Sequence, residues 1–362
     1  MSDNPIVLKG IHHVELWVGN ARQAAYYYRK AFGMSQLAYC GLETGRRDRT
    51  SYLLGQNQIR LVLTSPLQGG GPINDHLNRH GDGVRDIAFA VDDVDQAFRL
   101  AVERGANAAE APHDESDARG TVRRAAIKTY GETLHSFIGR RDYRGVFLPG
   151  FEEQRVEQIG CGLELVDHIV GNVEQGRMDH WAEWYSRVFG FHRYITFDDK
   201  DISTEFSALQ SVVMSDDNHL IKFPINEPAE ARRRSQIQEY LDFYDSAGVQ
   251  HVALLTRNIV ATVQRMMDSG VEFLAAPGAY YDTILDRVGP IDEPLNKLEP
   301  LGILIDNDEN GYLLQIFTRP VQDRPTLFFE VIQRQGARGF GKGNFKALFE
   351  AIEREQDRRG NL

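Results

Sequence analysis

Apolar and polar residues alternate along short stretches of this chain, and several of these stretches lead through a turn into a segment with helical periodicity. Residues 11–34, IHHVELWVGNARQAAYYYRKAFGM, predict an apolar strand carrying histidine, a Gly-Asn turn and an aromatic-rich amphipathic helix that ends near Phe-Gly. Residues 165–191, LVDHIVGNVEQGRMDHWAEWYSRVFGF, repeat that order. An internal repeat of this kind indicates two copies of one structural module.

Two further pairs of segments extend the repeat. Residues 83–106 match residues 248–271, and both predict a strand, a turn, a helix and then a glycine. Residues 120–139 match residues 301–318, and each of these predicts two strands joined by a turn at a glycine. The pattern therefore favours two homologous α+β modules in tandem.

The segment between the modules differs in character from both. Residues 147–160, FLPGFEEQRVEQIG, lack periodicity and carry proline, glycine and charge, which is typical of a linker. We place the boundary near residue 155, so that the N-terminal module is 1–155 and the C-terminal module is 156–362. The C-terminal module ends in a glycine-rich turn, QGARGFGKGN, and a last helix that Asn344 is expected to cap. The apolar face of that helix consists of Phe345, Leu348, Phe349 and Ile352.

Composition and charge narrow the class of partner. The 362 residues are 42% hydrophobic, and no apolar run approaches the roughly 18 residues of a membrane span. A net charge of -11 argues against nucleic acid or an anionic membrane as the main partner, so we expect a small molecule. The N-terminus has no signal pattern, and the two cysteines, Cys40 and Cys161, have no partner motif; both features favour the cytoplasm. Dinucleotide, phosphate-loop and nucleophile-elbow motifs are missing.

Three residues of the second half each interrupt an apolar strand: His168 in LVDHIVGNV, His251 in GVQHVALL and Glu330 in LFFEVIQR. They are 83 and 79 positions apart, so only a sheet that folds back on itself could bring them together. Alternation places Glu330 on the same side as two apolar neighbours, where a lone carboxylate is unfavourable. Two imidazoles and one carboxylate are the facial triad of non-heme Fe(II) oxygenases.

The alternative is that these residues are structural, with core histidines bonded to the backbone and a glutamate paired with Lys or Arg. Comparison of the two halves of the chain favours the metal-site interpretation over the structural one. His13 matches His168, but Asp86 stands where His251 would be, and no acid of the first half lies on a strand resembling LFFEV. Residues needed only for the fold should persist in both copies. We therefore expect a metal site in the C-terminal module and a degenerate, metal-free N-terminal copy.

Eight motifs in one order give the chain a specific resemblance. They are VDHIVGNV, PINEP, RRSQIQEYL, GVQHVALLT, PGAYYD, LGILIDNDENGYLLQIFTRP, RPTLFFEVIQR and GFGKGNFKALFE. Together they resemble the 4-hydroxyphenylpyruvate dioxygenase family of the vicinal oxygen chelate superfamily, over nearly the whole chain. The resemblance implies two βαβββ-repeat modules, each a curved sheet forming an open barrel, and a C-terminal helix that closes the site.

The resemblance also implies an activity. It predicts one Fe(II) per chain, held by His168, His251 and Glu330, and the conversion of 4-hydroxyphenylpyruvate and O2 to homogentisate and CO2 in tyrosine catabolism, with no further catalytic residue. It implies a homo-oligomer, either a dimer or a tetramer. Substrate-binding residues carried over by motif are Ser211, Asn226, Gln236, Gln315, Phe317, Phe328, Phe340, Asn344 and Phe345. Gln250 also matches, but strict alternation would turn it away from His251, behind the ligands.

Two alternatives remain at this point. Hydroxymandelate synthase shares the fold, metal and substrate but hydroxylates the benzylic carbon. As the resemblance is understood, that family has an apolar residue in place of the PINEP asparagine and VIER in place of VIQR, whereas this chain has Asn226 and Gln333 and keeps Lys342, Gly343 and Asn344. A non-catalytic protein of the same fold that binds aromatic ligands is the second alternative, although binding alone needs no set of three metal ligands.

Overall fold

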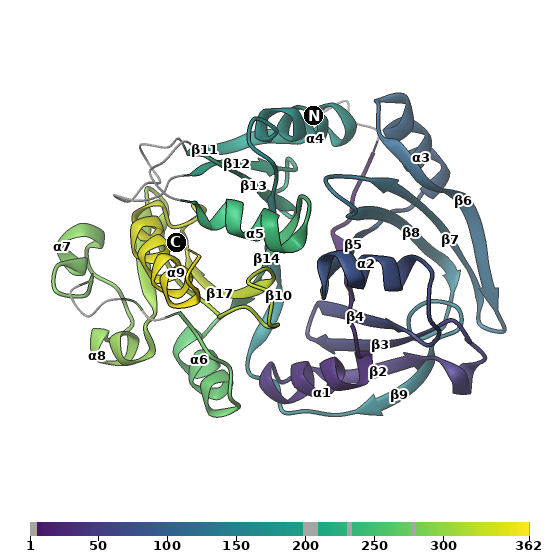
Figure 1. Cartoon of the computed structure of the whole chain (residues 1–362), viewed down its shortest axis with the longest axis horizontal. Helices are drawn as coiled ribbons and strands as arrows, with labels where there is room; N and C mark the ends of the chain where they lie inside the picture. Colours follow the sequence, from purple (N-terminus) through teal and green to yellow (C-terminus); the bar gives the residue numbers. More distant parts are fainter. Residues whose placement is uncertain (1–5, 198–208, 230–233, 275, 277–279, 362) are drawn as a thin grey trace.

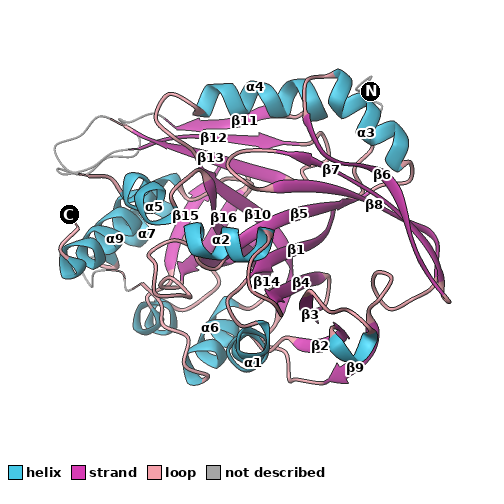
Figure 2. Ribbon diagram, turned by 45° about the vertical axis from the view of Figure 1, so that its right-hand side comes forward, coloured by secondary structure: helices cyan, strands magenta, loops and turns pink. Residues whose placement is uncertain are grey.

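The computed structural model describes residues 6–197, 209–229, 234–274, 276 and 280–361, and these residues form two curved sheets side by side. In Figure 1 the N-terminal module lies at the right and the C-terminal module at the left. The last helix, α9, lies to the left of α5. Figure 2 shows α3 and α4 at the top and α1 and α6 at the bottom, with most strands of both sheets between them. The strands therefore carry the residues that can meet inside each module.

The N-terminal module contains, among the described residues, a nine-stranded sheet in the order β6-β7-β8-β5-β1-β4-β3-β2-β9. Its strands are β1 Ile11–Trp17, β2 Ser35–Cys40, β3 Arg49–Gln56, β4 Ile59–Pro66, β5 Gly83–Ala90, β6 Asn107–Asp117, β7 Gly120–Lys128, β8 Leu134–Tyr143 and β9 Glu152–Val156. Its helices are α1 Ala21–Ala31, α2 Pro72–His80 and α3 Val94–Glu103, with a short 3-10 turn at Leu42–Thr44.

The C-terminal module contains, within the part of the chain that the structure describes, an eight-stranded sheet in the order β11-β12-β13-β10-β14-β17-β16-β15. Its strands are β10 Leu163–Asn172, β11 His192–Phe197, β12 Leu209–Ser215, β13 Lys222–Pro228, β14 Gly248–Thr256, β15 Leu304–Asp308, β16 Gly311–Phe317 and β17 Phe328–Gln335. Its helices are α4 Met178–Phe189, α5 Gln236–Tyr244, α6 Ile259–Asp268, α7 Ile284–Val288, α8 Leu295–Leu298 and α9 Phe345–Arg359, with 3-10 turns at Glu299–Leu301 and Lys342–Asn344.

The two strand orders are the same once β9 is set aside, with β1 to β8 corresponding to β10 to β17 in turn. The predicted repeat of α+β modules is therefore confirmed. One of the three predicted matches was wrong by one strand: β7 and β8 correspond to β16 and β17, whereas residues 301–318 contain β15 and β16. The error arose because both hairpins have a glycine turn between apolar strands, and local pattern does not say which hairpin carries the partner of β5.

Two local predictions also need correction. The predicted linker contains strand β9, which pairs with β2 and receives a hydrogen bond from the Gln36 amide to the Gln154 carbonyl at 3.1 Å. The module boundary itself stays a prediction. Asn344 stands at the N-cap position of α9, but its side chain makes no capping hydrogen bond, because Tyr280 donates to its Oδ1 at 2.6 Å.

Two helices of the repeated segments begin at an asparagine cap. Asn20 accepts a hydrogen bond from the backbone N–H of Gln23 and starts α1, and Asn258 accepts one from Ala261 and starts α6. Both helices bury one apolar face against a sheet. These caps mark the helix starts in the segments 11–34 and 248–271, whereas α4 of the segment 165–191 begins without a side-chain cap.

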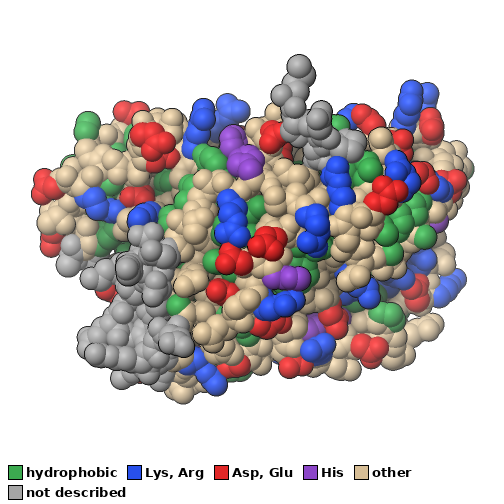
Figure 3. Space-filling view, turned by 90° about the horizontal axis from the view of Figure 1, so that it is seen from above, with side chains coloured by type: hydrophobic (Ala, Val, Ile, Leu, Met, Phe, Trp, Pro, Cys, Tyr) green, Lys and Arg blue, Asp and Glu red, His purple; other side chains and the backbone are tan. Residues whose placement is uncertain are grey.

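Charged side chains are distributed over the surface in mixed sign. On the face in Figure 3, Lys and Arg side chains lie among Asp and Glu side chains, and neither sign forms a continuous area over the coloured atoms. Among the described residues, no helix is both long enough and apolar enough to span a bilayer.

Both modules contribute to one hydrophobic core. Phe329 of β17 is 1% exposed and packs edge-on against Tyr28 of α1, at 5.6 Å between ring centroids, and against Phe32, the residue directly after α1, at 5.0 Å. Strand β17 also carries Glu330, on the opposite side of the sheet. The inter-module packing therefore supports the strand that carries one predicted ligand.

We expect Phe329→Ala to lower the free energy of unfolding by about 3–5 kcal/mol, because it leaves a cavity between the modules. Urea denaturation followed by circular dichroism measures this loss. Phe243→Ala is the matched control, because Phe243 is 38% exposed and should change stability little. Equal stabilities of the two variants would contradict the shared core.

Candidate metal centre

Three strands of the C-terminal module bring His168, His251 and Glu330 together. The Nε2 atom of His168 lies 3.1 Å from Oε2 of Glu330, and Nε2 of His251 lies 3.3 Å from the same oxygen. The three ligand atoms lie within 4.8 Å of one another, and all three residues are buried. The central strand makes this possible, because Ala253 of β14 is paired with His168 on one side and with Glu330 on the other. The methyl side chain of Ala253 is small, so the space between the side chains of His168 and Glu330 stays open.

The register of two strands is irregular beside each histidine. Pairing of β10 with β14 skips Asp167, and on β14 it skips Gln250. Such β-bulges re-aim side chains, so that neighbours in sequence can point the same way. Nδ1 of His168 lies 2.8 Å from Oδ1 of Asp167, and Nδ1 of His251 lies 3.0 Å from Oε1 of Gln250. Each of these oxygens accepts, so each imidazole carries its proton on Nδ1 and presents Nε2 to Glu330.

Asp167 joins the first histidine to a buried group of cations. Arg334 donates to it through Nε and Nη2, at 2.9 and 2.8 Å, and Nζ of Lys222 lies 3.2 Å from Oδ1. Burial opposes ionisation of this carboxyl group, but Arg334, His168 and Lys222 hold its pKa well below its usual range. Asp167 is therefore a fixed anion that orients His168.

The charges within the triad differ between its members. Burial raises the pKa of Glu330, but the two imidazoles outweigh burial and set it at about 2. Burial lowers the pKa of His168, yet Glu330 and Asp167 reverse this and leave the pKa raised; burial dominates at His251, whose pKa is lowered. Glu330 is thus an anion buried among nitrogen ligands.

This donor set fits a divalent transition metal. Two Nε2 lone pairs and a carboxylate converge from one side, and each histidine donates its other N–H to an oxygen acceptor, as metal-bound histidines do. A buried carboxylate beside two imidazoles also needs a positive charge between them. The triad predicted from sequence therefore has the geometry and the supporting hydrogen bonds of a metal centre.

The triad lines a cavity of about 60 Å³ inside the C-terminal sheet. Six residues expected from the resemblance also line it: Ser211, Asn226, Gln236, Phe317, Phe328 and Phe340. Gln250 lines it as well, so the expectation that this side chain turns away was wrong, because the bulge was not visible in the sequence. Leu348 and Phe349 of α9 close the cavity.

Aromatic rings surround the histidines. Phe328 stacks on His251 at 4.8 Å between centroids, and Phe317 meets the same imidazole edge-on at 5.9 Å. Phe340 meets His168 edge-on at 5.0 Å. These rings leave the space above the triad apolar and shield it from water.

Three other expected substrate residues lie elsewhere or are not described. Gln315 is buried outside the lining of the cavity, with its amide beneath Gly341, where an added Cβ would come within 2.6 Å of Nε2. Gly341 also has φ of 77°, which favours glycine. Asn344 faces Tyr280 and Arg287, away from the cavity. The side chain of Phe345 lies outside the described part of the chain. All three assignments stay predictions.

The N-terminal module has a hollow but not the ligand set. Its cavity, of about 740 Å³, is lined by acidic residues and arginines, among them Asp86 and Arg124, and by His13. Ser136 occupies the position of Glu330, because Leu134 pairs with Asp86 as Phe328 pairs with His251. Asp86 accepts a hydrogen bond from the Ser136 backbone at 3.0 Å, and burial raises its pKa to about 6. The first copy thus has one histidine and one acid at the three corresponding positions.

Known proteins are similar to this chain over almost its whole length. Two models of the Glyoxalase/Bleomycin resistance protein/Dioxygenase superfamily match residues 12–122 and 165–316. The 4-hydroxyphenylpyruvate dioxygenases of Dictyostelium discoideum and Yarrowia lipolytica are 49% and 48% identical; both alignments cover 98% of this chain, and they cover 100% and 94% of those proteins. A mutant 4-hydroxymandelate synthase from Streptomyces coelicolor has a solved structure that is 35% identical, with a TM-score of 0.86, and the match covers 96% of this chain and 99% of that chain.

The chain belongs to the 4-hydroxyphenylpyruvate dioxygenase family. The resemblance that eight motifs indicated is therefore confirmed, and with it the two-module fold. Membership in the 4-hydroxyphenylpyruvate dioxygenase family makes the C-terminal triad the candidate metal centre of this chain. Sequence reasoning missed Asp167, although it stands directly before His168 and an acid beside a ligand histidine is a recognisable signal.

We expect Asp167→Asn to weaken metal binding about 10–100-fold, because it removes the anion that orients His168 and leaves Arg334 unpaired. Anaerobic titration with Fe(II), followed by equilibrium dialysis and metal analysis, measures the affinity. Glu164→Gln is the control on the same strand, since the nearest cation to that carboxylate is Arg257 at 3.9 Å. Unchanged affinity in a folded Asp167→Asn variant would exclude an orienting role.

Proposed function

We propose that this chain is an Fe(II)-dependent dioxygenase that converts 4-hydroxyphenylpyruvate and O2 to homogentisate and CO2, a step of tyrosine catabolism. The observation that carries the proposal is the buried His168–His251–Glu330 triad at an aromatic cavity, in a chain 49% identical to a 4-hydroxyphenylpyruvate dioxygenase over its full length. The reaction balances, because one oxygen atom enters the new carboxylate, the other enters the ring, and CO2 leaves.

Iron bound at the triad would supply O2 activation coupled to oxidative decarboxylation of the 2-oxo acid. The residues of the chain have other tasks. His168, His251 and Glu330 would hold the ion, and the cavity that they line would leave room for substrate beside it. Asp167 and Gln250 fix the imidazoles, and they hold the Nδ1 protons throughout.

The cavity offers an apolar wall and a polar end. Phe317 and Phe328 provide the wall for the aromatic ring of the substrate. Ser211 and Asn226 face each other across β12 and β13, and Oε1 of Gln236 is buried without a hydrogen-bond partner among the described residues. Such a buried acceptor supports a role in binding a donor of the substrate, here assigned to the phenol.

Helix α9 would separate the reaction from solvent. Leu348 and Phe349 cover the cavity, and Arg359 at the far end of the helix donates to the buried Glu239 of α5 at 3.2 and 2.8 Å. Gln236 lies one turn before Glu239 on α5 and lines the cavity. The ion pair thus ties the covering helix to an element of the substrate site.

The hydroxymandelate synthase alternative depends on the residue at 226. Of the five residues that separated the families in sequence, Gln333, Lys342, Gly343 and Asn344 do not line the cavity. Gln333 accepts from the Ile259 N–H at 2.7 Å and donates to Glu293. Asn226 lines the cavity. We therefore assign discrimination between the two outcomes to Asn226, and the lower identity to the solved synthase, 35%, supports the dioxygenase.

We further propose a cytoplasmic location and a homo-oligomer, a dimer or a tetramer. Both cysteines are free and buried, which supports a reducing compartment. The mixed surface charge and the formal net charge of -11 support a small molecule as the partner, without nucleic acid or membrane.

We expect anaerobic protein loaded with Fe(II) to release homogentisate and one equivalent of CO2 when hydroxyphenylpyruvate and O2 are supplied. Chromatography with mass detection identifies the product. Hydroxymandelate as the main product would favour the synthase, and binding without O2 consumption would favour a non-catalytic protein.

Glu330→Ala should lower turnover by more than about 100-fold, because the loss of a metal ligand should exceed the effect of losing a residue that supports a ligand. The exposed Glu309→Ala is its control.

A further inference from the structure

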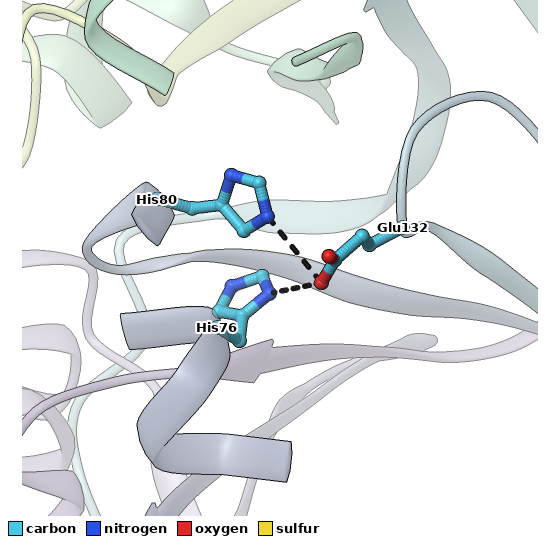
Figure 4. Close-up of side chains that lie close together, drawn as sticks. All are labelled: His76, His80 and Glu132. Atoms are coloured by element: carbon cyan, nitrogen blue, oxygen red, sulfur yellow. Dashed lines mark ion pairs between the residues drawn. The ribbon is translucent and has the colours of Figure 1, made fainter. Parts of the chain in front are cut away.

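A second group of potential metal ligands lies outside the active site, in the N-terminal module. His76 and His80 stand four residues apart on one face of α2, and Glu132 lies in the turn between β7 and β8. Figure 4 shows both imidazoles directed toward the same carboxylate oxygen. Nε2 of His80 lies 3.3 Å from Oε2 of Glu132, and Nδ1 of His76 lies 3.8 Å from it.

The histidines of this cluster are buried and incompletely hydrogen-bonded. His76 is 1% exposed, and neither of its ring nitrogens has a hydrogen-bond partner among the described residues. His80 is fully buried, and its Nδ1 donates to the backbone carbonyl of Tyr244, while its Nε2 has no hydrogen-bond partner there. Buried polar atoms rarely lack a hydrogen-bond partner, and each such case calls for an explanation.

The hydrogen bond to Tyr244 determines what His80 offers. Because the ring proton is on Nδ1, the Nε2 lone pair points toward the carboxylate of Glu132. Two electron-rich atoms at 3.3 Å attract each other only through a cation between them. A histidine that donates its other N–H to a backbone carbonyl is also the usual arrangement of a metal ligand.

The surroundings hold these groups in place. Trp17 and Tyr244 pack on the imidazoles, with ring centroids 5.3 Å from His76 and 4.4 Å from His80. Arg79 pairs with the other oxygen of Glu132 at 3.3 Å, and Oε2 remains toward the histidines. Arg85 lies 3.7 Å from Oε2, with its guanidinium over the ring of Trp17. These two arginines fix the carboxylate, and their charge makes binding weaker than at an acidic site.

We propose that His76, His80 and Glu132 form a second metal site, one that takes a divalent ion of the zinc class. Two imidazole nitrogens and one carboxylate oxygen suit Zn²⁺ or Co²⁺ better than Ca²⁺ or Mg²⁺, which prefer oxygen ligands. The half-exposed Glu132 leaves a path for water as fourth ligand. This site is separate from the triad, since its residues come from α2 and the β7–β8 turn.

The position of the site suggests a structural role. An ion there would bind α2 to the β7–β8 turn at the place where Tyr244 and Asp245 of the C-terminal module meet them. Arg79 reinforces this contact by donating to Asp245 at 2.8 Å. Helix α5, which ends at Tyr244, begins at Gln236 in the substrate cavity. The ion would therefore fix the two modules against each other behind α5.

The test is metal stoichiometry in the full chain. We expect metal-free protein to bind two equivalents of Co²⁺, measured by equilibrium dialysis and by the visible absorption of bound Co²⁺. Glu132→Gln, which keeps the shape of the side chain, and His76→Ala should each reduce this to one equivalent. Glu330→Ala should retain the equivalent at the new site, so the result does not depend on the proposed function. His113→Ala, which removes a partly exposed histidine of the same module, should leave both equivalents bound.

A wild-type stoichiometry of one, lost in Glu330→Ala and unchanged in Glu132→Gln, would overturn the proposal and leave a proton as the cation between His80 and Glu132. Two equivalents retained in both Glu132→Gln and His76→Ala would also overturn it. Circular dichroism of each variant establishes that it is folded. Zn²⁺ should compete with Co²⁺ for the second equivalent, and it should raise the melting temperature of Glu330→Ala but not of the double variant Glu330→Ala/Glu132→Gln.

Discussion

A carboxylate inside a hydrophobic strand is the constraint on which the C-terminal module depends. Glu330 is 3% exposed, and burial of an unpaired anion costs several kcal/mol. Its surroundings supply two imidazoles rather than a lysine or an arginine, so full neutralisation requires an added ion. Strand β14 pairs with β10 on one side and with β17 on the other, and only the methyl group of Ala253 lies between His168 and Glu330. Side chains from three strands can therefore reach one ion.

A histidine binds a metal ion only when its imidazole is neutral and correctly oriented. The irregular register of β10 and β14 meets this requirement. A regular strand would send Asp167 and Gln250 to the face opposite their histidines. The bulges keep them beside the imidazoles, where they fix the Nδ1 protons. Arg334 and Lys222 then keep Asp167 ionised. The hydrogen bonds that support the two histidines therefore depend on strand register as much as on residue type.

Much of this architecture could be predicted from sequence, because the chain contains two copies of one module that can be compared with each other. The repeat exposed Asp86 opposite His251 and so marked the second half as the functional one. What could not be predicted was register: the third match was off by one strand, so Ser136 could not be recognised as the counterpart of Glu330. The bulge that turns Gln250 into the cavity was hidden for the same reason, since periodicity assumes regular pairing.

The two histidines of α2 show a different limit. Their spacing of four residues is visible in the sequence, but Glu132 comes from a distant turn, and the carbonyl of Tyr244 comes from the other module. Only packing of the modules brings these groups together. Ligand sets made of local and distant residues are therefore found in a structure more readily than in a sequence.

The distances along the chain between the ligands also determine the order in which the active site can be assembled. His251 and Glu330 become neighbours only after β17 joins β14 in parallel, a contact between residues 79 positions apart, and such long-range pairing is slow. No hairpin of this module carries all three ligands. A metal ion therefore cannot nucleate folding by binding an early local fragment at this site; it would enter a module whose sheet is already formed. A shortage of that metal would leave the chain folded rather than misfolded.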